Sequence, residues 1–339
     1  MGSRTNPRAR GFRRALGLAL VLIPGMAALS CRKSEPAGTA APPVASSVAP
    51  KAVEPTAVLV AAPGPSIRAK AEPGGAPFSG LAAPQGAAFD GQGRLWIVDT
   101  GKAAIRIFAA SGGSLGGWGG LGTGDYAMKD PMGIAIRGDN VYVADTYRTG
   151  VELFSTAGQW KSKVHSDLYA PHGVAVGRDG KVWIADSGND RLVVCDADLS
   201  GPRSIGKGGS GPSEFSGPTA VAVSPSGKIY VADTGNRRVQ ILDASGRFES
   251  RFPFPGWASR TDPYLEVDQD ESVYATDSAA SAVVQLDARG KELRRWTKDD
   301  AGRSFGWPTG LALDRRNRTL VVVNTTPPSV TVLSLSRKR

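Results

Sequence analysis

The sequence predicts an all-β fold of the propeller type, and three observations support this prediction. One strand pattern occurs six times, and its copies begin at Pro84, Pro131, Pro171, Pro218, Pro263 and Pro308. The gaps between these prolines are 47, 40, 47, 45 and 45 residues, which matches the period of four-stranded propeller blades. A unit of this size is too small to bury its own faces, so neighbouring units must pack together.

The fourth copy, residues 217–246, shows the elements of one unit in order. An apolar strand is followed by a Ser-Pro-Ser-Gly turn, a second strand that ends at Asp233, a Gly-Asn turn and a third strand. Residues of these types supply the backbone conformations that tight turns need. A shorter run follows most copies, such as RFESRFP after the fourth, and we expect it to form the fourth and outermost strand.

The sixth copy lacks such a run, because SVTVLSLS is followed only by three basic residues. An unpaired sheet edge has to be covered. The segment that starts at Ser66 parallels the segment that starts at Ser204, before the fourth copy. We therefore expect residues 66–70 to form the outer strand of the last unit and to close the ring.

These copies resemble NHL repeats in the elements PxGVAV, GxIYVAD, a Thr-Gly-Asn or Ser-Gly-Asn turn, and an Arg that begins the third strand. The resemblance covers residues 66–336 and is clearest in the third and fourth copies. It is weakest in the sixth, where Asn324 replaces the expected Asp. The resemblance implies a six-bladed β-propeller. It implies no single activity, because the family includes binding scaffolds as well as enzymes.

The first 30 residues are typical of an export signal. Five arginines lie within the first 14 residues, and an apolar run then covers residues 15–30 with Pro24 inside it. That run is shorter than the roughly 20 residues of a membrane-spanning helix, so it favours a cleaved signal. Residues 28–31, Ala-Leu-Ser-Cys, resemble a bacterial lipobox, which implies that Cys31 becomes lipidated after cleavage. The alternative is an ordinary signal with an incidental cysteine.

Lipidation of Cys31 would place the protein at the bacterial envelope. Arg32 is not the aspartate that retains such lipoproteins at the inner membrane, so we expect the outer membrane, facing the periplasm or the cell surface. Residues 31–65 are rich in Ala, Pro, Ser and Val, a composition that favours a disordered tether. The expected organisation is a signal at 1–30, a tether at 31–65 and a propeller at 66–339. Within the tether, residues 57–61 remain an alternative strand.

The formal net charge of +10 gives little support to nucleic-acid binding, because the excess lies outside the repeats. From Ala76 onward the chain has 31 basic and 28 acidic residues, and the last three residues are all basic. The repeats themselves are therefore close to neutral, whereas a nucleic-acid interface needs a concentrated basic surface. Cys195 lies in an alternating strand pattern and is expected to be a buried small hydrophobic residue.

The most informative positions for function are those that follow the six prolines. In this kind of blade the innermost strand begins after the proline and the second strand ends at the repeated Asp, so both positions open onto one face. We expect ligand-binding residues around the channel on this face, and they are Gln85, Met132, His172, Thr219, Tyr264 and Thr309. Arg148 and Trp307 are predicted at its rim, and with Tyr147 and Tyr264 they suit a protein, peptide or glycan partner.

His172 supports an enzymatic alternative, a metal-assisted lyase or a lactonase-like hydrolase at the channel. The PHG sequence there resembles one metal-binding histidine of the peptidyl-hydroxyglycine amidating lyases. Zinc needs three or four protein ligands, and the one other histidine of the chain is His165. Lactonase-like propellers hold calcium with acidic residues, but here only Asp130 and Asp262, each before its proline, offer carboxylates, and a turn role suits them. We therefore predict no cofactor and no metal site.

Two further sets of repeated residues are expected to be structural. The aspartates at the ends of the second strands should accept hydrogen bonds from turn amides, with Arg191 and Arg238 paired to two of them. These aspartates are Asp99, Asp145, Asp186, Asp233 and Asp277. The aromatic residues three positions earlier should fill the core between units. They are Trp96, Tyr142, Trp183, Tyr230 and Tyr274.

Overall fold

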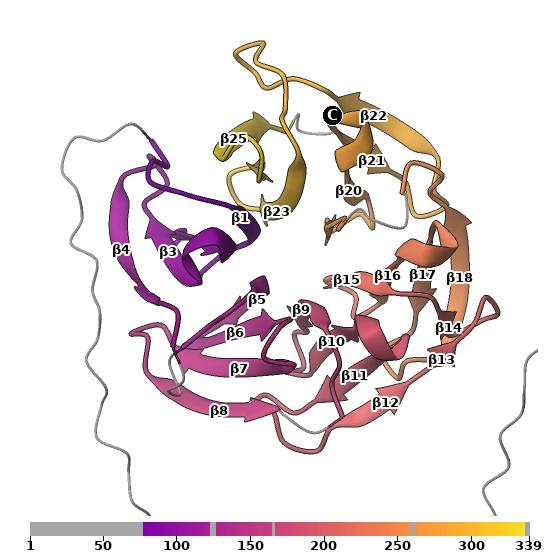
Figure 1. Cartoon of the computed structure of the whole chain (residues 1–339). Helices are drawn as coiled ribbons and strands as arrows, with labels where there is room; N and C mark the ends of the chain where they lie inside the picture. Colours follow the sequence, from indigo (N-terminus) through magenta and orange to yellow (C-terminus); the bar gives the residue numbers. More distant parts are fainter. Residues whose placement is uncertain (1–76, 123–126, 165–166, 258–261, 336–339) are drawn as a thin grey trace, which may run out of the picture. The chain divides into compact units, whose positions relative to one another are not determined.

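The computed structural model describes residues 77–122, 127–164, 167–257 and 262–335, all of which belong to the unit Val60–Arg339. Six of the β-sheets formed by these residues, numbered here as blades 1 to 6, surround a central axis (Figure 1). In blades 1 to 5 the four strands pair antiparallel in sequence order, from the inner strand to the outer one. The predicted six-bladed β-propeller is therefore confirmed.

The first three blades have these bounds. Blade 1 contains β1 (Pro84–Phe89), β2 (Leu95–Asp99), β3 (Ala104–Phe108) and β4 (Ser114–Gly119). Blade 2 contains β5 (Pro131–Arg137), β6 (Asn140–Asp145), β7 (Gly150–Ser155) and β8 (Trp160–Val164). Blade 3 contains β9 (Pro171–Val176), β10 (Val182–Asp186), β11 (Arg191–Cys195) and β12 (Arg203–Ile205).

The last three blades continue the pattern, and a short parallel pair, β13 (Lys207–Gly208) and β14 (Glu214–Phe215), precedes them. Blade 4 contains β15 (Pro218–Val223), β16 (Ile229–Asp233), β17 (Arg238–Leu242) and β18 (Phe248–Pro253). Blade 5 contains β19 (Leu265–Val267), β20 (Val273–Asp277), β21 (Ala282–Leu286) and β22 (Glu292–Trp296). Blade 6 contains β23 (Pro308–Asp314), β24 (Thr319–Asn324) and β25 (Ser329–Ser334).

Short 3₁₀ turns follow the second strand in four blades: η1 (Thr100–Lys102), η2 (Ser187–Asn189), η3 (Thr234–Asn236) and η4 (Ser278–Ala280). No helix in the described part of the chain has the length and apolar character needed to cross a bilayer. The predicted signal, the tether and the outer strand at residues 66–70 lie outside the described residues. Closure by that strand therefore stays a prediction.

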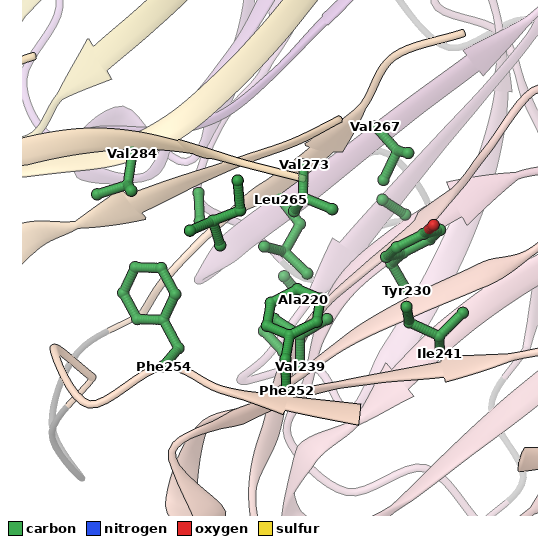
Figure 2. Close-up of a cluster of buried hydrophobic side chains, with 14 of the residues drawn as sticks. Ala220, Tyr230, Val239, Ile241, Phe252, Phe254, Leu265, Val267, Val273 and Val284 are labelled. Atoms are coloured by element: carbon green, nitrogen blue, oxygen red, sulfur yellow. The ribbon is translucent and has the colours of Figure 1, made fainter. Parts of the chain in front are cut away.

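Apolar packing between blades holds the ring together. Each pair of neighbouring blades shares one cluster of buried side chains, including the pair formed by blades 6 and 1. Figure 2 shows the cluster between blades 4 and 5, where Val239 and Phe252 pack near Leu265 and Val284. The repeated aromatic side chains are buried as predicted, and Cys195 lies in the cluster between blades 2 and 3. Burial raises the pKa of the Cys195 thiol to about 11, as expected for a packing residue.

In blades 1 to 4 the repeated aspartates fix the start of the inner strand. Asp99 accepts hydrogen bonds from the amides of Ala82 and Ala83, just before β1, and Asp233 accepts one from Ser216, just before β15. The carboxylate therefore ties the end of the second strand to the segment entering the inner strand of the same blade. The predicted arginine pairs are also present, with Arg191 at 2.7 Å from Asp186 and Arg238 at 2.6 Å from Asp233.

The inner strand of blade 5 differs from the prediction, because β19 begins at Leu265 and not at Pro263. The residue before the repeated Asp is Thr276 in this blade, where other copies have Ala or Val. The Tyr264 amide donates to the Thr276 hydroxyl at 2.9 Å. The Tyr264 amide therefore bonds to a side-chain hydroxyl and not to a backbone carbonyl, and the β19–β20 strand pairing begins one residue later, at Leu265.

Replacing Asp233 by Ala is expected to lower the free energy of unfolding by about 3–5 kcal/mol, because it leaves the buried Arg238 guanidinium without its carboxylate. Chemical denaturation measures the loss. Asp287→Ala is the control, since Asp287 accepts bonds from Arg289 and Lys291 in an exposed turn, and its loss should be much smaller. Equal effects of the two substitutions would contradict the structural role assigned to Asp233.

Candidate functional site

The six predicted channel residues lie at one face of the propeller, called here the ring face. Strand pairing fixes this placement in blades 1 to 4 and 6, where the proline pairs with the residue that ends the second strand, as Pro84 does with Asp99 and Pro131 with Asp145. In blade 5 the strand pairing begins at Leu265, and hydrogen bonds between Tyr264 and Thr276 place Tyr264 at the same end of the second strand. Four of the six side chains are buried, and only two are partly exposed. The buried ones are Met132, His172, Tyr264 and Thr309, and the others are Gln85 and Thr219. The ring residues therefore form a recessed floor.

Two of these residues each pair with a second hydroxyl group of the same blade. The Thr219 hydroxyl lies 2.6 Å from that of Thr234, and the Thr309 hydroxyl lies 2.6 Å from that of Thr325. Hydroxyl pairs of this kind satisfy both groups without a ligand. Their geometry supports a structural role more directly than a binding role.

Tyr264 crosses the channel. Its hydroxyl donates to the carbonyl of Met132, which joins blade 5 to blade 2 on the opposite side of the axis. Burial raises the pKa of Tyr264, so the hydroxyl stays protonated and remains a donor. From the sequence, Tyr264 is predicted in an amphipathic patch with Tyr147, Arg148 and Trp307. The structure shows that it is 9% exposed and forms the floor beneath that patch.

Two carboxylates, Asp130 and Asp262, lie near His172. The His172 Nε2 atom is 3.7 Å from an Asp262 carboxylate oxygen, too long for a hydrogen bond, and Asp130 is close enough to interact with both electrostatically. Burial lowers the pKa of His172, while the two carboxylates oppose that effect. Its Nδ1 atom is buried and has no hydrogen-bond partner among the described residues, and the same holds for Gln85 Oε1.

A turn role was predicted for Asp130 and Asp262 from the sequence. Within the described residues, neither carboxylate accepts a hydrogen bond from a turn amide, and the Asp130 backbone donates to Asp145. Sequence reasoning missed their convergence on His172, although both directly precede a blade proline. The described residues hold no group of three His, Cys, Asp or Glu side chains placed to bind a metal. His165 lies outside those residues.

Exposed aromatic side chains surround this floor. Tyr147 is 63% exposed, Tyr169 is 62% exposed and Trp307 is 40% exposed. Tyr147 follows the end of β6, whereas Tyr169 and Trp307 precede β9 and β23, so all three lie at the ring face. Tyr169 was not singled out from the sequence. The feature that could have indicated the position of Tyr169 is Gly188. A Cβ atom at this residue would lie 2.2 Å from the Tyr169 ring, so the glycine leaves room for that side chain.

Arg148 lies at the same face but is directed toward the protein. Its guanidinium donates to the carbonyl of Ala127 and lies 3.7 Å from the buried Glu152 carboxylate. Lys129, in contrast, places its ammonium 3.3 Å from the centre of the Tyr147 ring. The outer part of the ring face therefore combines aromatic rings with charged groups of both signs.

Asp130→Asn is expected to raise the melting temperature at pH 7 by roughly 2 °C. Burial, then the Asp145 charge, raises the pKa of Asp130 in the folded state. Ionisation of this carboxyl therefore costs the folded state more than the unfolded one. The gain should shrink as the pH falls through the raised pKa and vanish at about pH 3, below the unfolded-state pKa of 3.8, where both states are protonated.

Asp139→Asn is the matched control with the opposite sign. Hydrogen bonds from Thr156 and Lys161 lower the pKa of Asp139 to about 2. This variant should therefore melt below the wild type at pH 7, with the difference disappearing as the pH falls from about 4 toward 2. Melting curves of both variants between pH 2 and pH 7 test these two predictions. An Asp130→Asn variant less stable than the wild type at pH 7 would contradict a raised pKa of Asp130 in the folded state.

Comparison with known proteins agrees with the repeat structure. The NHL repeat family model matches residues 168–195 and 215–242, in blades 3 and 4. Human NHL-repeat-containing protein 4 is 35% identical over 94 residues, which cover 26% of this chain and 72% of that protein. The E3 ubiquitin-protein ligase NHLRC1 of rat and of mouse is 29% identical over 108 residues, which cover 32% of this chain. The match spans only 27% of the ligases' own length.

Solved structures with the same fold include enzymes. A virginiamycin B lyase from Staphylococcus aureus aligns with a TM-score of 0.52 at 14% identity, over 76% of this chain and 86% of the lyase. A gluconolactonase from Xanthomonas campestris aligns with a TM-score of 0.58 at 17% identity, over 82% of this chain and 99% of that enzyme. Identities this low show the fold alone. The repeat motifs, the six blades and the match to the human protein together establish that the chain belongs to the NHL-repeat family.

Proposed function

We propose that the protein is a lipid-anchored binding module of the bacterial envelope, which recognises a protein or peptide partner at the ring face. One observation carries the proposal: the exposed large aromatic side chains among the described residues are Tyr147, Tyr169 and Trp307, and all three lie on this face. Tyrosine and tryptophan are enriched at protein interfaces, where they supply much of the binding energy.

The floor between these aromatics adds polar specificity. Asp130 and Asp262 carry negative charge beside the buried His172, and Gln85 and His172 each keep a buried polar atom without a partner among the described residues. A buried polar atom left unpaired is unfavourable. A partner side chain that donates hydrogen bonds into this recess would satisfy these groups, and a cationic side chain would also match the two carboxylates.

The anchor is the part of the proposal that rests on the sequence alone. Lipidation of Cys31 and a tether at residues 31–65 would hold the propeller near a membrane surface, with its ring face accessible. In cell fractionation, the wild-type protein should enter the membrane fraction and Cys31→Ala should become soluble. An unchanged distribution would remove the anchor from the proposal without affecting the recognition surface.

The second candidate is a lyase or lactonase-like activity at the channel, and His172 is the observation that favours it. A buried imidazole with a carboxylate nearby, here 3.7 Å away in Asp262, is a pair of groups that acid–base catalysis uses. This activity predicts turnover that disappears in His172→Ala, together with bound metal in the purified wild type. If the protein turns over neither lactones nor peptidyl-hydroxyglycine substrates but captures a partner, the result supports the binding module instead.

Photo-crosslinking at position 307 tests the binding proposal in cells. A photoreactive residue in place of Trp307 should give a discrete crosslinked product, because this side chain lies in the proposed interface. Leu293 is the matched control, since it is 46% exposed compared with 40% for Trp307 but lies on the outer strand β22. Labelling at 293 should give no such product.

The purified partner then allows a direct measurement. Trp307→Ala is expected to weaken binding roughly 10- to 30-fold, as for a central aromatic anchor. Leu293→Ala should leave the dissociation constant unchanged. Equal crosslinking at both positions, or unchanged affinity of Trp307→Ala, would show that the ring face is not the interface.

A further inference from the structure

A cavity of about 190 Å³ occupies the central channel on the other side of Tyr264. The inner strands of all six blades contribute to its wall, and Tyr264 lines its inner end. The wall includes the residues that end three inner strands, so the cavity extends toward the face opposite the ring face. One lining residue from each blade shows its character, and these are Phe89, Ile136, Val176, Val223, Glu266 and Arg315.

Glu266 breaks the pattern of this wall. In each blade, one inner-strand residue pairs with the repeated aromatic position of the second strand, and Glu266 pairs with Tyr274 in this way. The residue at the same position in each of the other five blades is an alanine, and these are Ala88, Ala135, Ala175, Ala222 and Ala312. Packing between blades therefore favours a small apolar side chain at this position, so packing does not explain the carboxylate of Glu266.

Arg315 is the polar neighbour of Glu266. Its Nη2 atom is 3.3 Å from a Glu266 carboxylate oxygen and also donates to the carbonyl of Val267, which joins blade 6 to blade 5. The pair is incomplete, because the Arg315 Nε atom is buried without a hydrogen-bond partner among the described residues. Burial raises the pKa of Glu266 despite the nearby guanidinium. An ion pair that served only to tie two blades together would be expected to use its donors more fully.

We propose that this cavity binds a small, net-neutral molecule with an apolar body and a head that donates a hydrogen bond to Glu266 and accepts one from Arg315. A carboxamide and an α-amino acid both carry such a head. The site is separated from the ring face by Tyr264, and the proposal does not depend on the function assigned to that face.

Three properties of the cavity define this ligand class. The Glu266–Arg315 pair has no net charge, so a ligand with a net charge would meet one like charge there. Ala, Val, Ile, Leu and Phe side chains lie between polar atoms in the remaining wall, and these side chains can contact an apolar body. The volume of about 190 Å³ exceeds the roughly 150 Å³ of an engineered cavity that admits benzene, so a molecule of roughly six to nine heavy atoms fits.

Four probes with the same branched apolar body and different heads test the proposal on the full-length protein. They are isovaleramide, leucine, isovalerate and isoamylamine. Ligand-observed NMR titration should show isovaleramide or leucine binding at least tenfold more tightly than the anion and the amine. Tighter binding of isovaleramide would indicate a carboxamide ligand, and tighter binding of leucine would indicate an α-amino acid. Equal binding of all four, tighter binding of a charged probe, or no binding of any would overturn the proposal.

Variants show whether the polar pair is responsible. Glu266→Ala installs the residue found in the other five blades and should weaken binding of the preferred probe roughly tenfold, as loss of a hydrogen bond predicts. Arg315→Gln provides an independent variant if the first folds poorly. Ala222→Leu should block binding by reducing the cavity, and Trp307→Ala should have no effect. A melting temperature lowered by Glu266→Ala with unchanged probe binding would show that the pair only joins the blades.

Discussion

Closure between blades 6 and 1 is the contact on which the rest of the structure depends. Every blade exposes two apolar faces, and blades 1 and 6 meet without consecutive chain between them. Their contact is a cluster in which Ile97 and Phe108 of blade 1 pack with Val321 and Val323 of blade 6. The carbonyl of Pro84 also accepts a hydrogen bond from the hydroxyl of Thr325 at 2.7 Å. Without this seam, two apolar faces would remain exposed to water.

The seam requires a close backbone approach that one residue type allows. A Cβ atom at Gly310 would lie 2.0 Å from the carbonyl oxygen of Gln85, so a larger residue would push β23 away from β1. The closed ring in turn places six inner strands around one channel, and Tyr264 divides that channel by reaching Met132. The two ends consequently differ in chemistry, with carboxylates and aromatics at the ring face and an apolar wall with one ion pair at the other.

Much of the architecture was predictable because it repeats along the sequence. The period gave six blades, and each blade's alternation placed Trp96 and Tyr230 in the core and Asp233 at a strand end. Contacts across the channel were not predictable, since they join residues of different copies. Tyr264 reaches Met132, 132 residues away in the chain, and the approach of His172 to Asp262 depends in the same way on the closed ring. Glu266 was visible as an exception among aligned copies, but its meaning required the cavity.

Native-state hydrogen exchange of the amides in β1 (Pro84–Phe89) and β23 (Pro308–Asp314) tests ring closure most directly. A linear array of repeats frays at its ends, whereas a closed ring has no ends. The structure predicts that the hydrogen-bonded amides of β1 and β23 exchange together with those of the inner strands of blades 3 and 4, through global unfolding. Exchange of β1 or β23 by a separate, lower-energy opening would contradict a closed ring.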